Sequence, residues 1–332
     1  MKIAVVGSGA WGTALAIRLH KNNHDVTIWT YEKELIPQME ETRVNPRLPG
    51  ATLPEGMKIT GDYSCVAGCP LVVMASPSFP LRSVCKGIAP YLEENAVIVS
   101  VTKGIETGTG LRMSQIVEQE TGKKVVVLTG PTHAEEVSLD IPTGILAAST
   151  DKALAEMVQD AFMSDHFRVY TSPDPVGAEL GAALKNVIAL CAGVTDGLGY
   201  GDNTKALLMT RGLTEMARLG VSLGASKESF TGLSGIGDLI VTCTSMHSRN
   251  RRAGILIGQG KSVQDAMQEV GAVVEGYYAA RGAWELGQRQ GIDMPITEAA
   301  YKVLYEGADA RTACETLLLR RKKAESEDAG WL

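Results

Sequence analysis

A glycine motif near the N-terminus limits the possible folds of this chain more than any other feature. Gly7-Ser8-Gly9-Ala10-Trp11-Gly12 directly follows the β-branched run Lys2–Val6 and opens the helical pattern Ala10–Lys21. In such a unit Gly7 makes the tight turn, Gly9 lets the backbone approach a pyrophosphate, and Gly12 lets the helix pack on the strand. The anion then lies on free N–H groups at the positive end of the helix dipole. The motif therefore predicts a dinucleotide-binding βαβ unit, with a purely structural turn as the alternative.

The first half of the chain continues the same alternation of strands and helices. Its apolar runs are continuous, as expected for a parallel sheet that is covered on both faces. We therefore predict an α/β doubly wound, Rossmann-type sheet. The predicted strands after Lys2–Val6 are Asp25–Trp29, Leu71–Ala75, Val97–Val101, Val125–Leu128, Gly144–Ala148 and His166–Tyr170.

The pattern changes after Ser172-Pro173-Asp174-Pro175, a cluster of helix and strand breakers in which Asp174 is placed to cap a helix. We predict a dinucleotide-binding domain over residues 1–172 and an all-helical substrate and catalytic domain over 173–332. The helix over Gly177–Val194 is apolar nearly all round and is expected to be buried. The other predicted helices are Asn203–Leu219, Val263–Val270, Gly276–Arg289, Ile296–Glu306 and Ala310–Leu319.

Composition excludes several classes of protein. With 32 Lys plus Arg against 38 Asp plus Glu, the net charge of −6 argues against a broad nucleic-acid-binding face. Six cysteines are too few for a disulfide scaffold, and no zinc-like spacing follows Cys65 and Cys69, so we predict no metal site. The N-terminus fits a mature strand and helix better than a signal peptide, and no apolar stretch is long enough to span a membrane. We expect a cytoplasmic protein with reduced thiols.

The end of the second predicted strand bears on the choice of dinucleotide. A site specific for NAD places a carboxylate there to bind the ribose 2′-hydroxyl. Here the sequence is Thr30-Tyr31-Glu32-Lys33, in which Glu32 lies slightly late and Lys33 would favour a 2′-phosphate. NAD and NADP therefore both remain open.

Further candidate site residues follow the other predicted strands, where open α/β sheets bind ligands. Ser76-Pro77-Ser78, Lys103-Gly104 and Gly130-Pro131-Thr132 each close one strand. A lysine in this position is usually a solvated strand end, but three such ends beside one glycine loop favour a site. Lys103 could there neutralise a phosphate or a polarised oxygen.

Lys185 is the single residue that most strongly indicates a functional site, because it lies in a predicted apolar helix that is rich in Gly and Ala. A lysine in such a helix must snorkel, find a partner or lose its proton. A desolvated amine with a pKa near 7–8 can relay a proton. Small residues one turn away, at Gly181, Ala182 and Ala189, are expected to leave open space around it.

Three clusters in the second half complete the set. Gly235-Ile236-Gly237-Asp238 offers a carboxylate that could orient an ammonium group. Ser248-Arg249-Asn250-Arg251-Arg252 is either a solvated basic face or a fork that holds one phosphate. Val273-Val274-Glu275-Gly276 precedes a helix and is a candidate cap.

Together these motifs resemble a known family. The glycine motif, Thr102-Lys103-Gly104, Gly130-Pro131-Thr132, Leu184-Lys185-Asn186-Val187, Gly237-Asp238, Ser248-Arg249-Asn250 and Val274-Glu275-Gly276 occur in the order found in bacterial-type NAD(P)-dependent glycerol-3-phosphate dehydrogenases. The resemblance covers the chain to about Leu319. It implies a Rossmann domain followed by a helical domain like that of 6-phosphogluconate dehydrogenase. It also implies reduction of dihydroxyacetone phosphate to sn-glycerol 3-phosphate, with NADH or NADPH, for phospholipid synthesis.

Carried over by position, the resemblance assigns Lys185 to proton transfer. It implies substrate contacts for Lys103, Gly130, Thr132, Lys185, Asp238, Ser248, Arg249 and Asn250. It implies cofactor contacts for Gly7, Gly9, Ala10, Trp11, Gly12, Tyr31, Lys103, Ala134, Arg249, Val273 and Glu275.

Two places depart from the family pattern, and two other functions stay open. His133 stands where another aromatic residue is usual, which changes the packing of the substrate pocket, and Thr30-Tyr31-Glu32-Lys33 lacks the common Arg. The alternatives are a related two-domain β-hydroxyacid dehydrogenase and a non-catalytic dinucleotide-sensing regulator. A phosphorylated small-molecule substrate and a homodimer are the expected partners.

Overall fold

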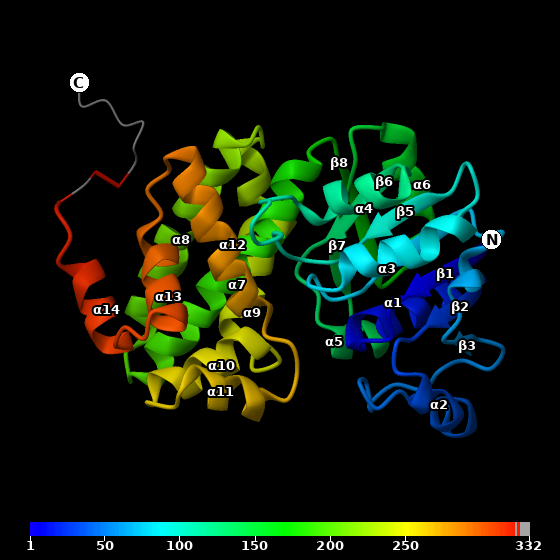
Figure 1. The fold of residues 1–332 in the computed structure, drawn as a ribbon, viewed down its shortest axis with the longest axis horizontal. Helices are drawn as coiled ribbons and strands as arrows, with labels where there is room; N and C mark the ends of the chain where they lie inside the picture. Colours follow the sequence, from blue (N-terminus) through cyan, green and yellow to red (C-terminus); the bar gives the residue numbers. More distant parts are fainter. Residues whose placement is uncertain (323, 326–332) are drawn as a thin grey trace.

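A single twisted sheet and a helical bundle make up the two halves of the structure (Figure 1). The structure is a computed structural model that describes residues 1–322 and 324–325. Among these residues, eight strands form one sheet in the order β3-β2-β1-β4-β5-β6-β7-β8. The strands are β1 Lys2–Val6, β2 Asp25–Trp29, β3 Lys58–Thr60, β4 Leu71–Met74, β5 Val97–Ser100, β6 Val125–Thr129, β7 Thr143–Ala148 and β8 Phe167–Ser172.

Most neighbouring strands run parallel, which confirms the predicted Rossmann-type sheet, but one pair does not. β7 runs antiparallel to β6, with Leu128 opposite Ala147, and β8 is parallel to β7. Only the short helix α5 (Ala134–Ser138) separates β6 from β7. A short return of this kind joins antiparallel strands, whereas a parallel pair needs a longer crossover. The strand β3 was not predicted, because three residues carry too little periodicity.

Alternate residues of the central strand β1 pack into two different cores. Ile3 and Val5 join a cluster with α1 and α6, while Ala4 and Val6 join a cluster with α3 and α4. The sheet is therefore covered on both faces, as its continuous apolar strands predicted. The helices of this part are α1 Ala10–Lys21, α2 Ile36–Thr42, α3 Leu81–Ile88, α4 Met113–Thr121, α5 and α6 Lys152–Phe162.

The described part of the chain from Pro175 onward is helical and is built around α7 (Pro175–Gly197). The predicted burial of this helix is confirmed, and it begins and ends slightly outside the predicted range. Glycines allow a close crossing with α10 (Arg249–Gly258), because a Cβ on Gly193 would lie 2.0 Å from the Arg251 carbonyl oxygen. The remaining helices are α8 Asp202–Ser222, α9 Asp238–Thr244, α11 Val263–Val270, α12 Glu275–Gln290, α13 Pro295–Tyr305 and α14 Ala310–Leu318.

Helix α10 starts inside the basic run that the sequence suggested as a solvated face or a phosphate fork. Ser248 is its N-cap, with the hydroxyl accepting from the Arg251 backbone N–H at 3.2 Å. The run is therefore the first turn of a helix. The last residues of the range predicted as the helical domain, 323 and 326–332, lie outside the described residues.

By length and composition α7 is long and apolar enough to cross a membrane. However, 89% of its most apolar window is buried inside the structure. Its apolar character therefore serves the core of the helical part. The short helical segments that join the main elements are Lys33–Leu35, Tyr63–Val66, Ala89–Tyr91, Lys227–Thr231 and Leu233–Gly237.

Candidate active site

The glycine loop leaves space for a ligand at one glycine only. Gly7 has φ +126°, and a Cβ there would lie 2.5 Å from the Ala75 carbonyl oxygen. A Cβ on Gly12 would lie 2.1 Å from the Gly7 carbonyl oxygen, so both positions require glycine for the fold. Around Gly9, by contrast, a Cβ would meet no atom within 4 Å in the described part of the chain. Gly9 is also the N-cap of α1 and supplies no side-chain cap. This open cradle at a helix N-terminus fits the pyrophosphate of a dinucleotide.

Lys185 is buried and bound to the start of α9. Its Nζ donates to Asp238 Oδ1 at 2.5 Å and to Thr242 Oγ1 at 2.6 Å. Gly181, one turn earlier, makes this approach possible, because a Cβ there would lie 2.5 Å from the Ser234 carbonyl oxygen. The expectation of open space around Lys185 is therefore wrong on this side, since the backbone of Leu233–Gly237 fills it.

Lys103 brings the sheet part into the same cluster. It follows β5, and its Nζ donates to Asp238 Oδ2 at 2.9 Å. One carboxylate thus joins two ammonium groups that come from opposite halves of the molecule. The structure therefore brings Lys103, Lys185 and Asp238 together, although Lys103 and Asp238 are 135 residues apart in the sequence.

The electrostatics of this cluster favour proton transfer near neutral pH. Burial lowers the pKa of Lys185 to about 7, with Asp238 opposing the shift and Lys103 adding to it. Burial would raise the pKa of Asp238, but the charges of Lys103 and Lys185 hold it below its ordinary value. The carboxylate is therefore ionised at neutral pH, and Lys185 is divided between its charged and neutral forms.

The loop after β6 lies against the same region. The Pro131 ring is next to Gly237, because a Cβ on Gly237 would lie 3.7 Å from Pro131 Cγ. Within the loop, Thr132 Oγ1 donates to the Gly130 carbonyl oxygen at 3.3 Å. The His133 ring lies 5.5 Å from that of His247, which directly precedes Ser248. Burial and the nearby charge of Lys185 lower the pKa of His133. The contact between His133 and His247 thus joins the two halves of the molecule.

The side chains of Ser248 and Asn250 are held by the protein itself. Asn250 Nδ2 donates to Asn186 Oδ1 at 2.9 Å, and its Oδ1 accepts from the Gly276 backbone N–H at 2.8 Å. Asn250 therefore ties α10 to α7 and α12. Arg249 is exposed and close to Glu275, so it is the member of the triplet that is most accessible to an anion.

Glu275, at the start of α12, forms a second bridge between the two halves. Ser78, in the loop after β4, donates to Glu275 Oε2 at 2.9 Å. Burial raises the pKa of Glu275. Val273, in the segment that precedes α12, is half-buried. Glu275 therefore lies beside the loop after β4 and close enough to Lys103 to feel its charge.

The other candidate cofactor residues lie around the glycine loop. Ala10 and Trp11 are half-buried and pack on the core beneath the sheet, whereas Tyr31 is exposed over 83% of its surface. Ala134 begins α5, which packs beside α1.

Sequence reasoning missed one residue that shapes this loop. The buried Asn45, between α2 and β3, donates from Nδ2 to the Ser8 carbonyl oxygen at 2.8 Å and to Thr13 Oγ1 at 2.7 Å. It lies in an irregular segment with no helical or strand periodicity, so no local signal identifies it. Thr242 was missed as a partner of Lys185 for a similar reason, since the contact depends on the tertiary packing of α9.

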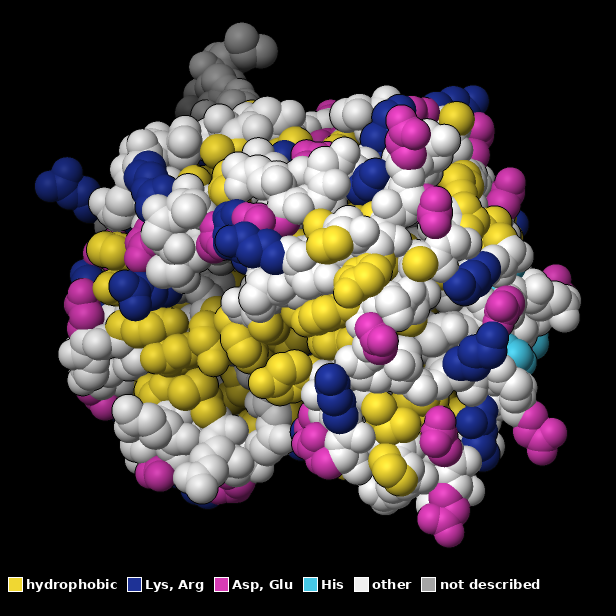
Figure 2. Space-filling view, turned by 45° about the vertical axis from the view of Figure 1, so that its right-hand side comes forward, with side chains coloured by type: hydrophobic (Ala, Val, Ile, Leu, Met, Phe, Trp, Pro, Cys, Tyr) yellow, Lys and Arg dark blue, Asp and Glu magenta, His cyan; other side chains and the backbone are white. Residues whose placement is uncertain are grey.

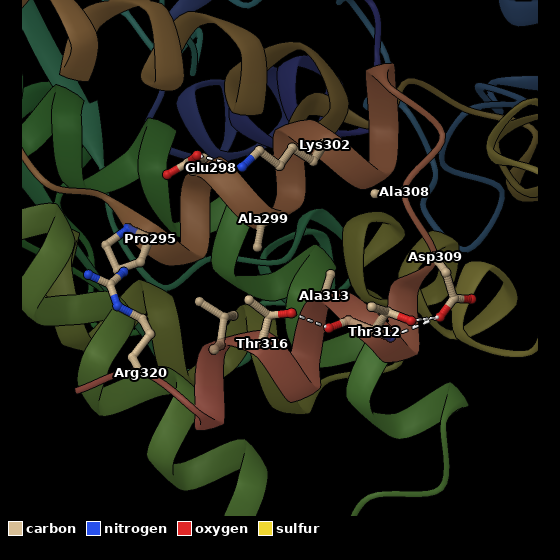
Figure 3. A pocket seen from close by; sticks show the side chains of 11 residues that line it. Pro295, Glu298, Ala299, Lys302, Ala308, Asp309, Thr312, Ala313, Thr316 and Arg320 are labelled. Atoms are coloured by element: carbon tan, nitrogen blue, oxygen red, sulfur yellow. Dashed lines mark hydrogen bonds and ion pairs between the residues drawn. The ribbon is translucent and has the colours of Figure 1, made fainter. Parts of the chain in front are cut away.

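A separate surface pocket of about 490 Å³ lies between α13 and α14, away from these residues (Figure 3). Its polar side chains already have partners: Lys302 bonds Glu298, and Asp309 bonds Thr312. None of the candidate site residues lines it. The site therefore lies at the junction of the two halves.

Comparisons with known proteins agree with this assembly of residues. The model of the NAD-dependent glycerol-3-phosphate dehydrogenase N-terminus matches residues 2–155, and that of the C-terminus matches residues 174–315. The chain belongs to this family. A glycerol-3-phosphate dehydrogenase (NAD(P)+) of Desulfitobacterium hafniense is 49% identical over 329 residues, covering 98% of this chain and 94% of the relative. A protein of the same name from Clostridium acetobutylicum is 50% identical, over 97% of this chain and 98% of the relative.

Solved structures show the same relationship. The crystal structure of a glycerol-3-phosphate dehydrogenase from Coxiella burnetii has a TM-score of 0.93 and 36% identity, and the match covers 96% of this chain and 99% of that chain. A ketopantoate reductase from Ralstonia eutropha, with 17% identity and a TM-score of 0.61, shares only the fold. The family resemblance inferred from the sequence motifs is therefore confirmed.

Proposed function

We propose that the protein is an NAD(P)-dependent glycerol-3-phosphate dehydrogenase that interconverts dihydroxyacetone phosphate and sn-glycerol 3-phosphate. Membership of the family supports this activity, which supplies glycerol phosphate for phospholipid synthesis. The observation that carries the mechanism is the buried Lys185–Asp238–Lys103 cluster between the two halves. When bound, the nicotinamide supplies a hydride to the carbonyl carbon of the substrate.

Lys185 is the proposed proton-transfer residue. As the carbonyl is reduced, its oxygen becomes an alkoxide that needs a proton and a positive neighbour. The Lys185 ammonium donates that proton, and in the reverse direction the neutral amine accepts it. Its pKa of about 7 places both forms within reach at neutral pH.

Asp238 and Lys103 are proposed to prepare Lys185 for this step. Asp238 fixes the direction of the Lys185 Nζ through the 2.5 Å contact and favours its charged form. Lys103 holds the other carboxylate oxygen and contributes a second positive charge to the pocket. It lies where the sheet meets the helical part, so it can contact both cofactor and substrate.

We assign the substrate phosphate to the region around Arg249. Its exposed guanidinium, beside the N-terminus of α10, provides charge-assisted hydrogen bonds for a phosphate. Ser248 and Asn250 then hold the backbone of this turn and border the site, while Gly130 and Thr132 border it from the sheet side.

The residues of the glycine loop fit the dinucleotide, in particular the open cradle at Gly9. Gly7 and Gly12 shape this cradle. The other proposed cofactor contacts are Ala10, Trp11, Tyr31, Lys103, Ala134, Arg249, Val273 and Glu275. The same arrangement supports a division into domains at 172/173, between the end of β8 and the start of α7.

The test is a spectrophotometric assay of NADH and NADPH oxidation with dihydroxyacetone phosphate, and with 2-oxo and 3-oxo acids as competing substrates. The proposal expects turnover with the phosphorylated ketone and none with the acids. Turnover with an oxo acid alone would identify a β-hydroxyacid dehydrogenase. Binding of the dinucleotide without any turnover would identify a sensing regulator.

We also propose that the enzyme acts in the cytoplasm as a homodimer. One face shows a broad area of hydrophobic side chains that is partly hollowed (Figure 2). Areas of this kind commonly mark contacts with another protein, and closed dimers are the commonest assemblies. Sedimentation equilibrium should give twice the 35.3 kDa chain mass. A mass equal to that of one chain at micromolar concentration would contradict the dimer.

A further inference from the structure

The second strand ends in an ion pair that the sequence did not reveal. Glu32, in the turn after β2, pairs with Arg47, whose Nε donates to Glu32 Oε2 at 3.3 Å and whose Nη2 bonds Oε1. The two side chains are half-exposed, with 31% and 50% of their surface accessible. They are thus free to exchange this contact for a ligand.

Both residues are tied to the glycine loop. The Glu32 backbone N–H donates to Thr30 Oγ1 at 3.2 Å, and that oxygen accepts from Ser8 Oγ at 2.6 Å. On the other side, the Arg47 backbone N–H donates to Asn45 Oδ1 at 2.9 Å. The Asn45 amide in turn holds the Ser8 carbonyl oxygen. The pair therefore lies beside the loop that fits the pyrophosphate, at the position of the adenosine ribose in this type of fold.

Lys33 does not share this position. Its side chain covers Gly61, where a Cβ would lie 2.6 Å from Lys33 Cγ and 2.8 Å from its Cε. Its charge acts on Asp62, beyond the end of β3. The contacts of Lys33 are therefore with the segment after β3, whereas Arg47 contacts Glu32 directly.

We propose that Glu32 and Arg47 determine how this enzyme distinguishes NAD from NADP. The inference rests on the proposed function and deepens it. With NAD, the Glu32 carboxylate accepts a hydrogen bond from the ribose 2′-hydroxyl while Arg47 neutralises it. With NADP, the Arg47 guanidinium leaves Glu32 and pairs with the 2′-phosphate. Each cofactor is thus met by one member of the pair, and the other member limits its affinity.

The proposed arrangement predicts that both cofactors bind without a strong preference. A 2′-phosphate gains a bidentate guanidinium partner but meets the charge of Glu32, which repels it. A 2′-hydroxyl gains the carboxylate, but that carboxylate is already engaged by Arg47. Neither the 2′-hydroxyl nor the 2′-phosphate therefore interacts favourably with both Glu32 and Arg47.

Binding measured by calorimetry tests the proposal without relying on turnover. The probes are NADH, NADPH and the fragments 5′-AMP and adenosine 2′,5′-bisphosphate. In Arg47→Gln we expect NADPH and the bisphosphate to bind at least tenfold more weakly, with NADH and 5′-AMP within threefold of wild type. In Glu32→Gln we expect NADPH to bind several-fold more tightly and NADH more weakly. Lys33→Gln is the matched control and should change the NADPH to NADH ratio less than twofold.

Several results would overturn the inference. Equal weakening of NADH and NADPH in Arg47→Gln would assign Arg47 only a structural role in the loop. A larger effect of Lys33→Gln than of Arg47→Gln would place the 2′-phosphate near Lys33. If wild type binds neither dinucleotide and shows no activity with dihydroxyacetone phosphate, the proposed function itself fails. If wild type is active but the variants keep its cofactor ratio, only this inference fails.

Discussion

Lys185 Nζ and Asp238 Oδ1 lie 2.5 Å apart in a pocket where both side chains are nearly inaccessible. Burial disfavours the charged form of each group, while their attraction restores it. The lysine is left with a pKa of about 7, and the acid stays ionised. Burial thus turns an ordinary lysine into a group that exchanges protons at neutral pH, while the contact with Asp238 opposes a further fall of its pKa.

This pairing predicts opposite pH profiles for the two directions of the reaction. Reduction of dihydroxyacetone phosphate needs protonated Lys185, so kcat/KM should fall as the pH rises through about 7. Oxidation of glycerol 3-phosphate needs the neutral amine and should rise over the same interval. Steady-state rates between pH 5.5 and 9 check this, and parallel profiles in both directions would contradict it.

In Asp238→Asn, the fall of kcat/KM for reduction with rising pH should occur at lower pH than in wild type. Removing the carboxylate removes the attraction that supports the charged form of Lys185, while Lys103 still repels it. Activity at pH 7 should therefore fall more than activity at pH 6. A uniform loss of rate at every pH would show that Asp238 acts only on geometry.

Gly9→Val should abolish dinucleotide binding and leave the fold intact. A Cβ at Gly9 meets no atom of residues 1–322 and 324–325 within 4 Å, so the added side chain would extend into the space proposed for the ligand. Gly12→Ala is the contrasting variant, because its Cβ would lie 2.1 Å from a backbone oxygen and should destabilise the protein. Calorimetry with NADH and thermal melts separate the two effects. Normal NADH affinity in Gly9→Val would show that the loop is only a turn.

The sequence was most informative where local pattern decides structure. Continuous β-branched runs located most of the strands, and Lys185 stood out because its helix is otherwise apolar. The partners of these residues were harder to find. Asn45 reaches Ser8 across 37 residues, and Lys103 reaches Asp238 across 135, so neither contact has a local signal. The strand β7 was predicted, but its reversed direction was not, because strand direction depends on the short return through α5.

Arg249→Ala should chiefly weaken substrate binding. Charge-assisted hydrogen bonds to a phosphate contribute roughly 1.5–3 kcal/mol, so we expect KM for dihydroxyacetone phosphate to rise about 10- to 100-fold. Because the Arg249 side chain is exposed, thermal stability should hardly change. An unaltered KM would show that the basic run is a solvated helix face and does not bind the substrate phosphate.

Glu215→Gln should stabilise the protein above neutral pH. Glu215 is buried in α8 and accepts hydrogen bonds from the backbone N–H groups of Ile296 and Thr297, at 2.6 and 3.2 Å, at the start of α13. Burial raises its pKa to about 7, so the folded state holds this proton more tightly than the unfolded state does. Stability is therefore lost as the pH rises from about 4.5 to about 7, by up to roughly 3 kcal/mol.

Glutamine keeps an acceptor for α13 without the charge, so its advantage in melting temperature should appear above pH 7 and vanish near pH 5. Glu215→Ala is the control, since it leaves buried donors without an acceptor and should destabilise at every pH. A pH-independent difference between Glu215→Gln and wild type would contradict the raised pKa.

The most direct test of the account is kcat of Lys185→Ala and Lys185→Met, measured beside thermal melts and calorimetric NADH binding. Methionine keeps most of the side-chain volume and separates packing from chemistry. Loss of a general acid alone typically lowers the rate 10²–10⁴-fold, and loss of its positive charge near the alkoxide adds to this. We therefore expect both variants to fold and bind NADH, with kcat reduced by about 10⁴ or more. Turnover within tenfold of wild type would show that Lys185 is not the proton-transfer residue, and Lys103 would be the next candidate.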